Sequence, residues 1–125
     1  MKTKWQRQIG ALIVALKQGA TKCEHITGRL FYRDSDGHPQ ACALGMIYVD
    51  GKNVARIRSI SFDKLYKEHP VLKTVTQYGY SLYDQIITLN DSEWLTPRQI
   101  VSWLRKLARR KTAPKYRWPI YGMGL

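Results

Sequence analysis

The sequence predicts an α+β fold, in the form of a predominantly helical single domain with a small β-hairpin or sheet. Two observations lead to this prediction: helical apolar periodicity at both ends of the chain, and a turn-rich centre with short apolar runs. The length of 125 residues suits one domain, and 44% hydrophobic residues are enough for one core. We therefore expect one globular domain over residues 1–113 and a basic, aromatic tail over residues 114–125.

The N-terminal segment predicts an amphipathic helix that ends near Gly19. Its apolar residues share one helical face and are Trp5, Ile9, Leu12, Ile13 and Leu16. The apolar run of residues 9–16 is too short to span a membrane and lacks the cleavage site of a signal peptide. These features predict a cytoplasmic protein that does not associate with membranes.

The segment after this helix is rich in turn-forming residues up to position 40. Within it, residues 29–33 (RLFYR) form a short apolar and aromatic run that predicts a strand. An Asp-Ser-Asp-Gly sequence follows directly at residues 34–37 and predicts a tight turn. We expect the β-structure to begin here and to lie between residues 29 and 60.

The run of residues 41–49 (ACALGMIYV) is apolar throughout and is therefore predicted to be buried. Its periodicity does not distinguish a strand from a helix. As a strand, it would turn at Asp50-Gly51 and pair with residues 54–60. As a helix, it would be closed by Gly51. Local signals favour the hairpin.

Three helical segments are predicted between residue 60 and residue 92. Ser61 is expected to cap a short helix that stops before Pro70. The apolar face of the second helix is predicted to contain Val71, Leu72, Val75 and Tyr78. The apolar face of the third is predicted to contain Leu82, Ile86 and Leu89. The last of these is predicted to run to Asn90-Asp91, which we interpret as a capping pair.

The final helix has the clearest start signal in the chain. Thr96, Pro97 and Gln99 combine an N-cap, a proline at the first helical position and the reciprocal residue of a capping box. Its buried stripe is predicted to contain Ile100, Val101, Leu104, Leu107 and Ala108.

Positive charge is concentrated in this helix and in the tail. The net charge is +12, and eight basic residues but no acidic ones follow Glu93. Arg98, Ser102, Arg105 and Arg109 are expected to share one exposed stripe. The candidate binding residues for nucleic acid or another partner are Arg98, Ser102, Arg105, Lys106, Arg109, Arg110, Lys111, Lys115, Arg117 and Trp118. Guanidinium and ammonium groups pair with phosphates, and tail aromatics can stack on unpaired bases.

A simpler interpretation is a solvated helix face, with cations placed favourably at the negative end of the helix dipole. That interpretation accounts for Arg109–Lys111, but not for the absence of acidic residues from the last 32 positions. The charge therefore predicts a polyanionic partner: nucleic acid, or an acidic protein or nucleoprotein surface. The oligomeric state is not predicted.

The cysteines and histidines offer two other interpretations. Cys23, His25, His38 and Cys42 could supply four zinc ligands, but their spacing does not match paired knuckles. Cys42 could alternatively be the nucleophile of a cysteine hydrolase, with His25, His38 or His69 as base and Asn90 or Asp91 as orienting group. An apolar setting raises the pKa of a thiol, so a packing role is favoured. We predict neither enzymatic activity nor a metal or other cofactor.

Several short segments form a recognisable pattern: residues 15–19 (ALKQG), 28–30 (GRL), 42–45 (CALG) and 87–91 (ITLND), with Ile100 and Trp103-Leu104 in the closing helix. This pattern resembles a widespread family of small, uncharacterised phage and prophage proteins. In that family an "ALxSGxY" segment and a "GxL" strand precede a "CCLGVL" core run, and "LxxLND" and an amphipathic closing helix follow. This chain has Ala41-Cys42 where the family has two cysteines, and Arg and Lys where the closing helix of the family has acidic residues.

The resemblance implies a phage-type accessory protein in the cytoplasm of a bacterial host cell and a helix at residues 41–49, and it supplies no catalytic residues. Combined with the charge pattern, it predicts a non-enzymatic protein that binds nucleic acid through its basic C-terminal helix and tail. The alternative is a phage-encoded inhibitor of a host defence nucleoprotein complex, similar in action to an anti-CRISPR protein.

Overall fold

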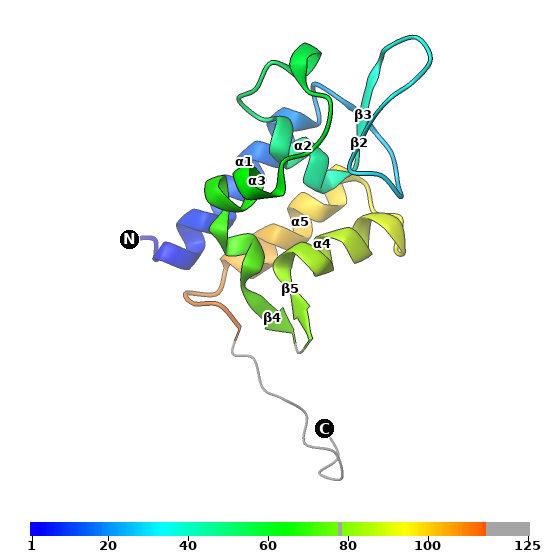
Figure 1. Cartoon of the computed structure of the whole chain (residues 1–125). Coiled ribbons are helices and arrows are strands. Elements are labelled where there is room, and N and C mark those ends of the chain that lie inside the picture. Colours follow the sequence, from blue (N-terminus) through cyan, green and yellow to red (C-terminus); the bar gives the residue numbers. More distant parts are fainter. Residues whose placement is uncertain (78, 115–125) are drawn as a thin grey trace.

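The computed structural model describes residues 1–77 and 79–114 (Figure 1). Its α-helices are α1 (Lys4–Gly19), α2 (Ala43–Val49), α3 (Phe62–Glu68), α4 (Leu82–Asp91) and α5 (Pro97–Ala108). Two 3₁₀ turns, η1 (Val54–Arg56) and η2 (Pro70–Lys73), connect them. The predicted class, a predominantly helical α+β domain, is confirmed. Three of the candidate residues, Lys115, Arg117 and Trp118, lie outside the described residues, as does most of the predicted tail.

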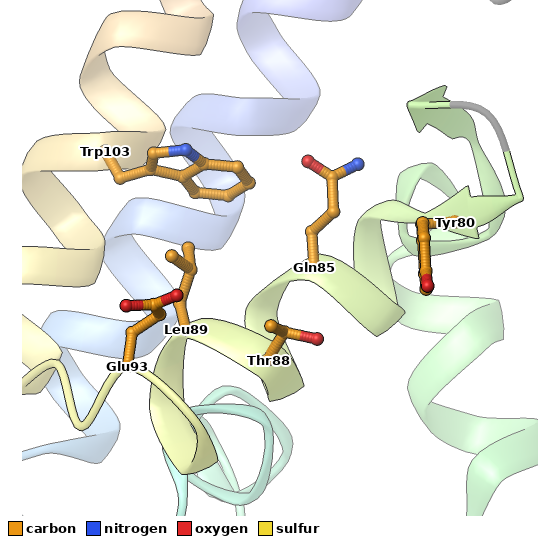
Figure 2. Close-up of a pocket in the computed structure, with 6 residues that line it drawn as sticks. All are labelled: Tyr80, Gln85, Thr88, Leu89, Glu93 and Trp103. Atoms are coloured by element: carbon orange, nitrogen blue, oxygen red, sulfur yellow. The ribbon is translucent and has the colours of Figure 1, made fainter.

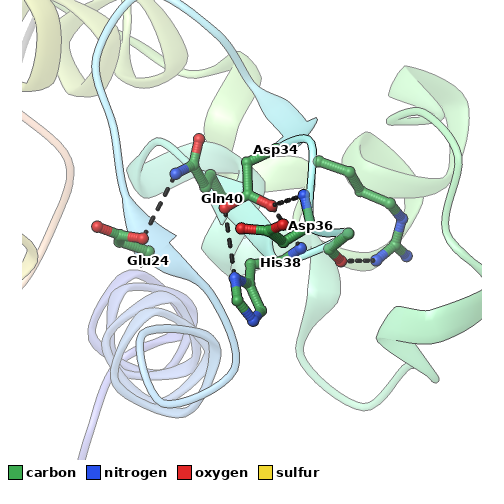
Figure 3. A network of polar contacts seen from close by, with 7 residues as sticks. Glu24, Asp34, Asp36, His38 and Gln40 are labelled. Carbon is green, nitrogen blue, oxygen red and sulfur yellow. Dashed lines mark hydrogen bonds and ion pairs between the residues drawn. The ribbon is translucent and has the colours of Figure 1, made fainter.

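The main sheet has the strand order β1-β3-β2, formed by Glu24–His25, Pro39–Ala41 and Phe31–Arg33. Strand β1 is parallel to β3, while β2 and β3 form an antiparallel hairpin. The predicted turn at residues 34–37 closes this hairpin. There the Asp34 carboxylate accepts hydrogen bonds from the backbone N–H groups of His38 and Asp36 (Figure 3). These bonds hold the pKa of Asp34 below its ordinary value.

The predicted hairpin between residues 41 and 60 is wrong. Residues Ala43–Val49 form helix α2, as the resemblance implied, and residues 54–56 form η1. All seven residues of the helix are buried, because neighbouring elements enclose it on every side. For this reason the helix has no polar face. A segment enclosed in this way favours a helix, which satisfies most of its backbone hydrogen bonds internally. Gly51, with φ 75°, makes the left-handed turn that follows the helix.

Two glycines allow the α2 backbone to lie close to its neighbours. A Cβ at Gly19 would lie 1.9 Å from the Met46 carbonyl oxygen, and one at Gly45 would lie 1.8 Å from the Leu30 carbonyl oxygen. The sequence suggests that Gly19 ends α1, which it does, but this backbone approach is the stronger reason for a glycine there. The core therefore forms around α2, between α1 and the α4 helix.

The helix predicted over residues 71–78 is also wrong. Pro70 starts the short turn η2, and the chain then becomes extended at Thr74. Strand β4 (Val75–Gln77) pairs with β5 (Tyr80–Ser81) in a second, two-stranded sheet. The β-branched residues at positions 74–76 favour this extended backbone over a helix. Tyr78, which the sequence predicts on the helical face, lies outside the described residues.

Two of the helix caps predicted from the sequence, at Ser61 and Thr96, are present. Ser61 accepts a hydrogen bond from the Lys64 N–H group, and Thr96 and Gln99 form the reciprocal capping box of α5. The α4–α5 connection contains Trp94, whose φ of 56° is the only positive φ of a described residue other than glycine. Its side chain is 77% exposed. None of the helices in residues 1–77 and 79–114 combines the length and apolarity needed to cross a bilayer.

Candidate nucleic-acid interface

Helices α1 and α5 pack side by side in opposite directions (Figure 1). At one end, the indole N–H group of Trp5 donates to the Leu107 carbonyl oxygen at 3.0 Å, and the side-chain amide of Gln6 donates to the Ala108 carbonyl oxygen at 2.9 Å. These bonds give side-chain donors from α1 to two carbonyl groups in the last turn of α5, where intrahelical donors run out. At the other end, the last turn of α1 faces the first turn of α5 across a shared groove.

This pairing brings together the two segments of the chain that lack acidic residues. All nine acidic residues lie between Glu24 and Glu93, where eight basic residues nearly balance them. The remaining thirteen basic residues lie before Glu24 or after Glu93, without any acidic residue beside them in the sequence. The excess positive charge of the protein therefore lies on α1, α5 and the segments that flank them.

The candidate binding residues on and just after α5 that the structure describes, six basic residues and Ser102, are all exposed. These are Arg98, Ser102, Arg105, Lys106, Arg109, Arg110 and Lys111, the last three at or just beyond the end of the helix. On the opposite side, Ile100, Val101 and Leu104 are buried, whereas Leu107 and Ala108 are only partly buried. None of the basic residues forms an ion pair within residues 1–77 and 79–114. Their charges are therefore available to an external anion.

The groove between α1 and α5 has a volume of about 400 Å³. It is lined by Lys17 and Ala20 from the α1 side and by Pro97, Arg98, Val101 and Arg105 from the α5 side. Three cations thus surround an apolar floor. Sequence reasoning missed Lys17, because nothing in the sequence near Lys17 shows that it faces α5.

Three of the residues considered as partners of Cys42 in a hydrolase, His25, Asn90 and Asp91, lie in a buried polar network around Asn90, which is 1% exposed. The Asn90 side-chain amide donates to the Ile26 carbonyl oxygen at 3.1 Å and to the Asp91 carboxylate at 2.7 Å. Its oxygen accepts from the Ala43 N–H group at 3.0 Å and lies 2.7 Å from His25 Nε2. Since that oxygen offers no hydrogen, His25 Nε2 must carry one and donate it.

The sequence-based interpretation of Asn90 as a cap of its own helix is wrong. Asn90 lies inside α4 and binds the first N–H group of α2, so it joins α4, β1 and α2. Asp91 extends the network by accepting from the Gly28 N–H group at 2.9 Å. Every buried side-chain polar atom of the described residues has a partner, which is typical of a structural network.

Cys42 lies beside this network at the N-cap of α2, but only 3% of it is exposed. Burial raises the pKa of its thiol, so the thiolate needed for nucleophilic attack is disfavoured. Of the proposed bases, His25 is engaged by Asn90, and His38 lies in the β2–β3 turn beside Asp34 (Figure 3). Burial lowers the pKa of the third, His69, at the end of α3. This arrangement favours a packing role for Cys42.

The four residues considered for zinc do not gather into one site. Among the described residues, the grouping of potential ligands is Asp34, Asp36 and His38, in the hairpin turn. The hydrogen bonds of Asp34 to the turn backbone explain this cluster without an ion.

The fold and the site thus define a small α+β domain with a basic, two-helix face. Comparisons with protein-family models, with curated proteins and with solved structures find no match to this chain.

Proposed function

We propose that this protein binds nucleic acid through phosphate contacts from the basic face of α1 and α5, without catalysing a reaction. The observation that supports the proposal is the separation of charge: thirteen basic residues and no acidic residue lie in the two terminal segments of the sequence, and the helices of these segments, α1 and α5, pack against each other. Like charges repel when they are gathered on one surface, and a polyanion relieves that repulsion. Phosphate contacts also release counterions, which supplies most of the affinity of such surfaces.

The cations of this surface are supplied by the exposed basic residues of α5 and by Lys17 of α1. Arg98 and Arg105 border the α1–α5 groove together with Lys17, and the other cations continue along the exposed side of the helix. A phosphate backbone lying along α5 can therefore meet cations from both helices. Arginine side chains can also form paired hydrogen bonds with phosphate oxygens.

Replacing Lys17 with glutamate tests the contribution of α1. We expect Lys17→Glu to weaken binding to a mixed-sequence DNA duplex by about tenfold near 0.1 M salt, because one phosphate contact is lost and one repulsive charge is added. Fluorescence anisotropy of a labelled duplex measures the change. Lys64→Glu is the matched control, since Lys64 is exposed on α3, within the charge-balanced part of the chain. Equal losses in the two variants would contradict the proposed position of the interface.

Capture of partners from a bacterial lysate separates nucleic acid from an acidic protein partner, the alternative expected from the sequence. The proposal predicts that tagged protein recovers nucleic acid from an untreated lysate and that nuclease treatment removes the captured material. Stoichiometric capture of one protein after nuclease treatment would instead support an inhibitor that occupies a host nucleoprotein complex, and would contradict direct nucleic-acid binding as the main activity.

A further inference from the structure

A second cavity lies on the other side of α5, between this helix and α4 (Figure 2). It has a volume of about 350 Å³ and is lined by Tyr80, Gln85, Thr88, Leu89, Glu93 and Trp103. Trp103 is half-buried against the core, and its indole ring extends above Leu89 toward Gln85 at this space (Figure 2). Lys106 follows Trp103 by three positions on α5, which makes the two side chains neighbours on the helix surface. The cavity therefore adjoins the basic face.

The Gln85 oxygen and the two Glu93 carboxylate oxygens of this cavity can only accept hydrogen bonds. The Tyr80 hydroxyl can donate or accept, and the Trp103 indole N–H group donates. The Gln85 amide nitrogen donates to the Thr76 hydroxyl, which leaves the Gln85 oxygen on the side of Trp103 (Figure 2). Glu93 contributes a carboxylate that has no ion pair within the described residues. Thr88 adds a hydroxyl group, which can donate or accept. A complementary ligand is flat, to stack on an indole ring, and carries N–H donors on one edge.

We propose that this cavity binds an unpaired nucleobase with an exocyclic amino group, and guanine in particular, from the strand held on the basic face. This inference rests on the proposed function and specifies the kind of nucleic acid that is bound. Guanine presents two adjacent N–H donors on its Watson–Crick edge, which match the two oxygens of the Glu93 carboxylate. Stacking on Trp103 adds affinity that does not depend on the identity of the base.

Charge argues against the other ligands that such a cavity could take. A cationic amine would satisfy Glu93 and Trp103, but the net charge of +12 and the neighbouring Lys106 repel it. A free anion would be repelled by Glu93. An uncharged base, whose own phosphate reaches Lys106, satisfies both the acceptors and the cation. Because the Watson–Crick edge must be free, the bound strand is single-stranded at this point.

Two oligonucleotides that differ at one base test this proposal. The probes are a thymidine 12-mer and the same 12-mer with one central guanosine, each labelled for fluorescence anisotropy. We expect the guanosine-containing strand to bind about tenfold more tightly, as is typical of a paired contact to a base edge. Glu93→Gln is expected to remove this preference, measured as the ratio of the two association constants, since it replaces one carboxylate oxygen by a donor.

The matched control is Asp36→Asn, which removes the same charge from an exposed turn in the β2–β3 hairpin. It should keep the preference for guanosine. Equal binding of the two strands by the unaltered protein, or an unchanged preference in Glu93→Gln, would overturn the base-binding site and leave the proposed function in place. Failure of both strands and of a DNA duplex to bind would overturn the two proposals together.

Discussion

Replacing Asn90 with leucine is expected to lower the free energy of unfolding by about 3–5 kcal/mol. Leucine is close to asparagine in size, so the main change is the loss of hydrogen bonds. The Ala43 N–H group, the Ile26 carbonyl group and His25 Nε2 would each lose the partner that Asn90 provides. Each polar group left unpaired in a buried place costs about 1–3 kcal/mol. A domain of this size is stable by roughly 5–15 kcal/mol, so the loss is a large fraction of the total.

Urea denaturation monitored by circular dichroism measures this effect. The matched control is Asn53→Leu, because Asn53 also accepts a backbone hydrogen bond, from the Ala55 N–H group at 3.1 Å, but does so at the surface. Asn53→Leu should lower the free energy of unfolding by about 1 kcal/mol, as is usual for the loss of a helix cap. If Asn90→Leu lowered the free energy of unfolding by no more than Asn53→Leu does, the network would not hold α2, β1 and α4 together.

Reversing the charge of Arg98, Arg105 and Arg109 together is expected to weaken binding to a DNA duplex by more than about a hundredfold near 0.1 M salt. The three residues share the exposed stripe of α5, and two of them border the α1–α5 groove. Each substitution removes a phosphate contact and adds a repulsive charge. Thermal stability should change little, since a glutamate favours the first turn of a helix at Arg98 and disfavours the end of the helix at Arg109.

A triple variant elsewhere on the molecule controls for the change in net charge. Arg56→Glu, Arg58→Glu and Lys64→Glu reverse three exposed cations in the part of the chain where acidic residues balance basic ones. This variant should keep most of the affinity for the duplex. If both triple variants lost affinity equally, binding would depend on overall charge, and the two-helix face would not be the interface.

Helices α1, α4 and α5 could be predicted because local signals agree in each. Each has an apolar stripe at helical spacing, and α5 also has a capping box and a proline at its first position. Helix α2 could not be predicted from its own residues, because it is buried on all sides and has no polar face. Whether this segment is a helix or a strand depends on its enclosure by α1 and α4, and on the close backbone contacts at Gly19 and Gly45.

Only the α5 side of the candidate interface could be predicted from the sequence. The absence of acidic residues from the last 32 positions is visible in the sequence, as is the same absence before Glu24. Only the antiparallel packing of α1 and α5 shows that the two basic segments form one face and that Lys17 faces Arg98 and Arg105. The Asn90 network was missed for the same reason, since it joins residues 25, 43 and 90, which are far apart in the sequence.

The dependence of duplex binding on salt is the most direct test of the basic face formed by α1 and α5. The logarithm of the association constant should fall linearly with the logarithm of the salt concentration, with a slope of about −0.9 for each phosphate contact. Contacts from Lys17 and the exposed α5 cations predict a slope between about −3 and −6. A slope near zero, or no binding at low salt, would contradict the proposal.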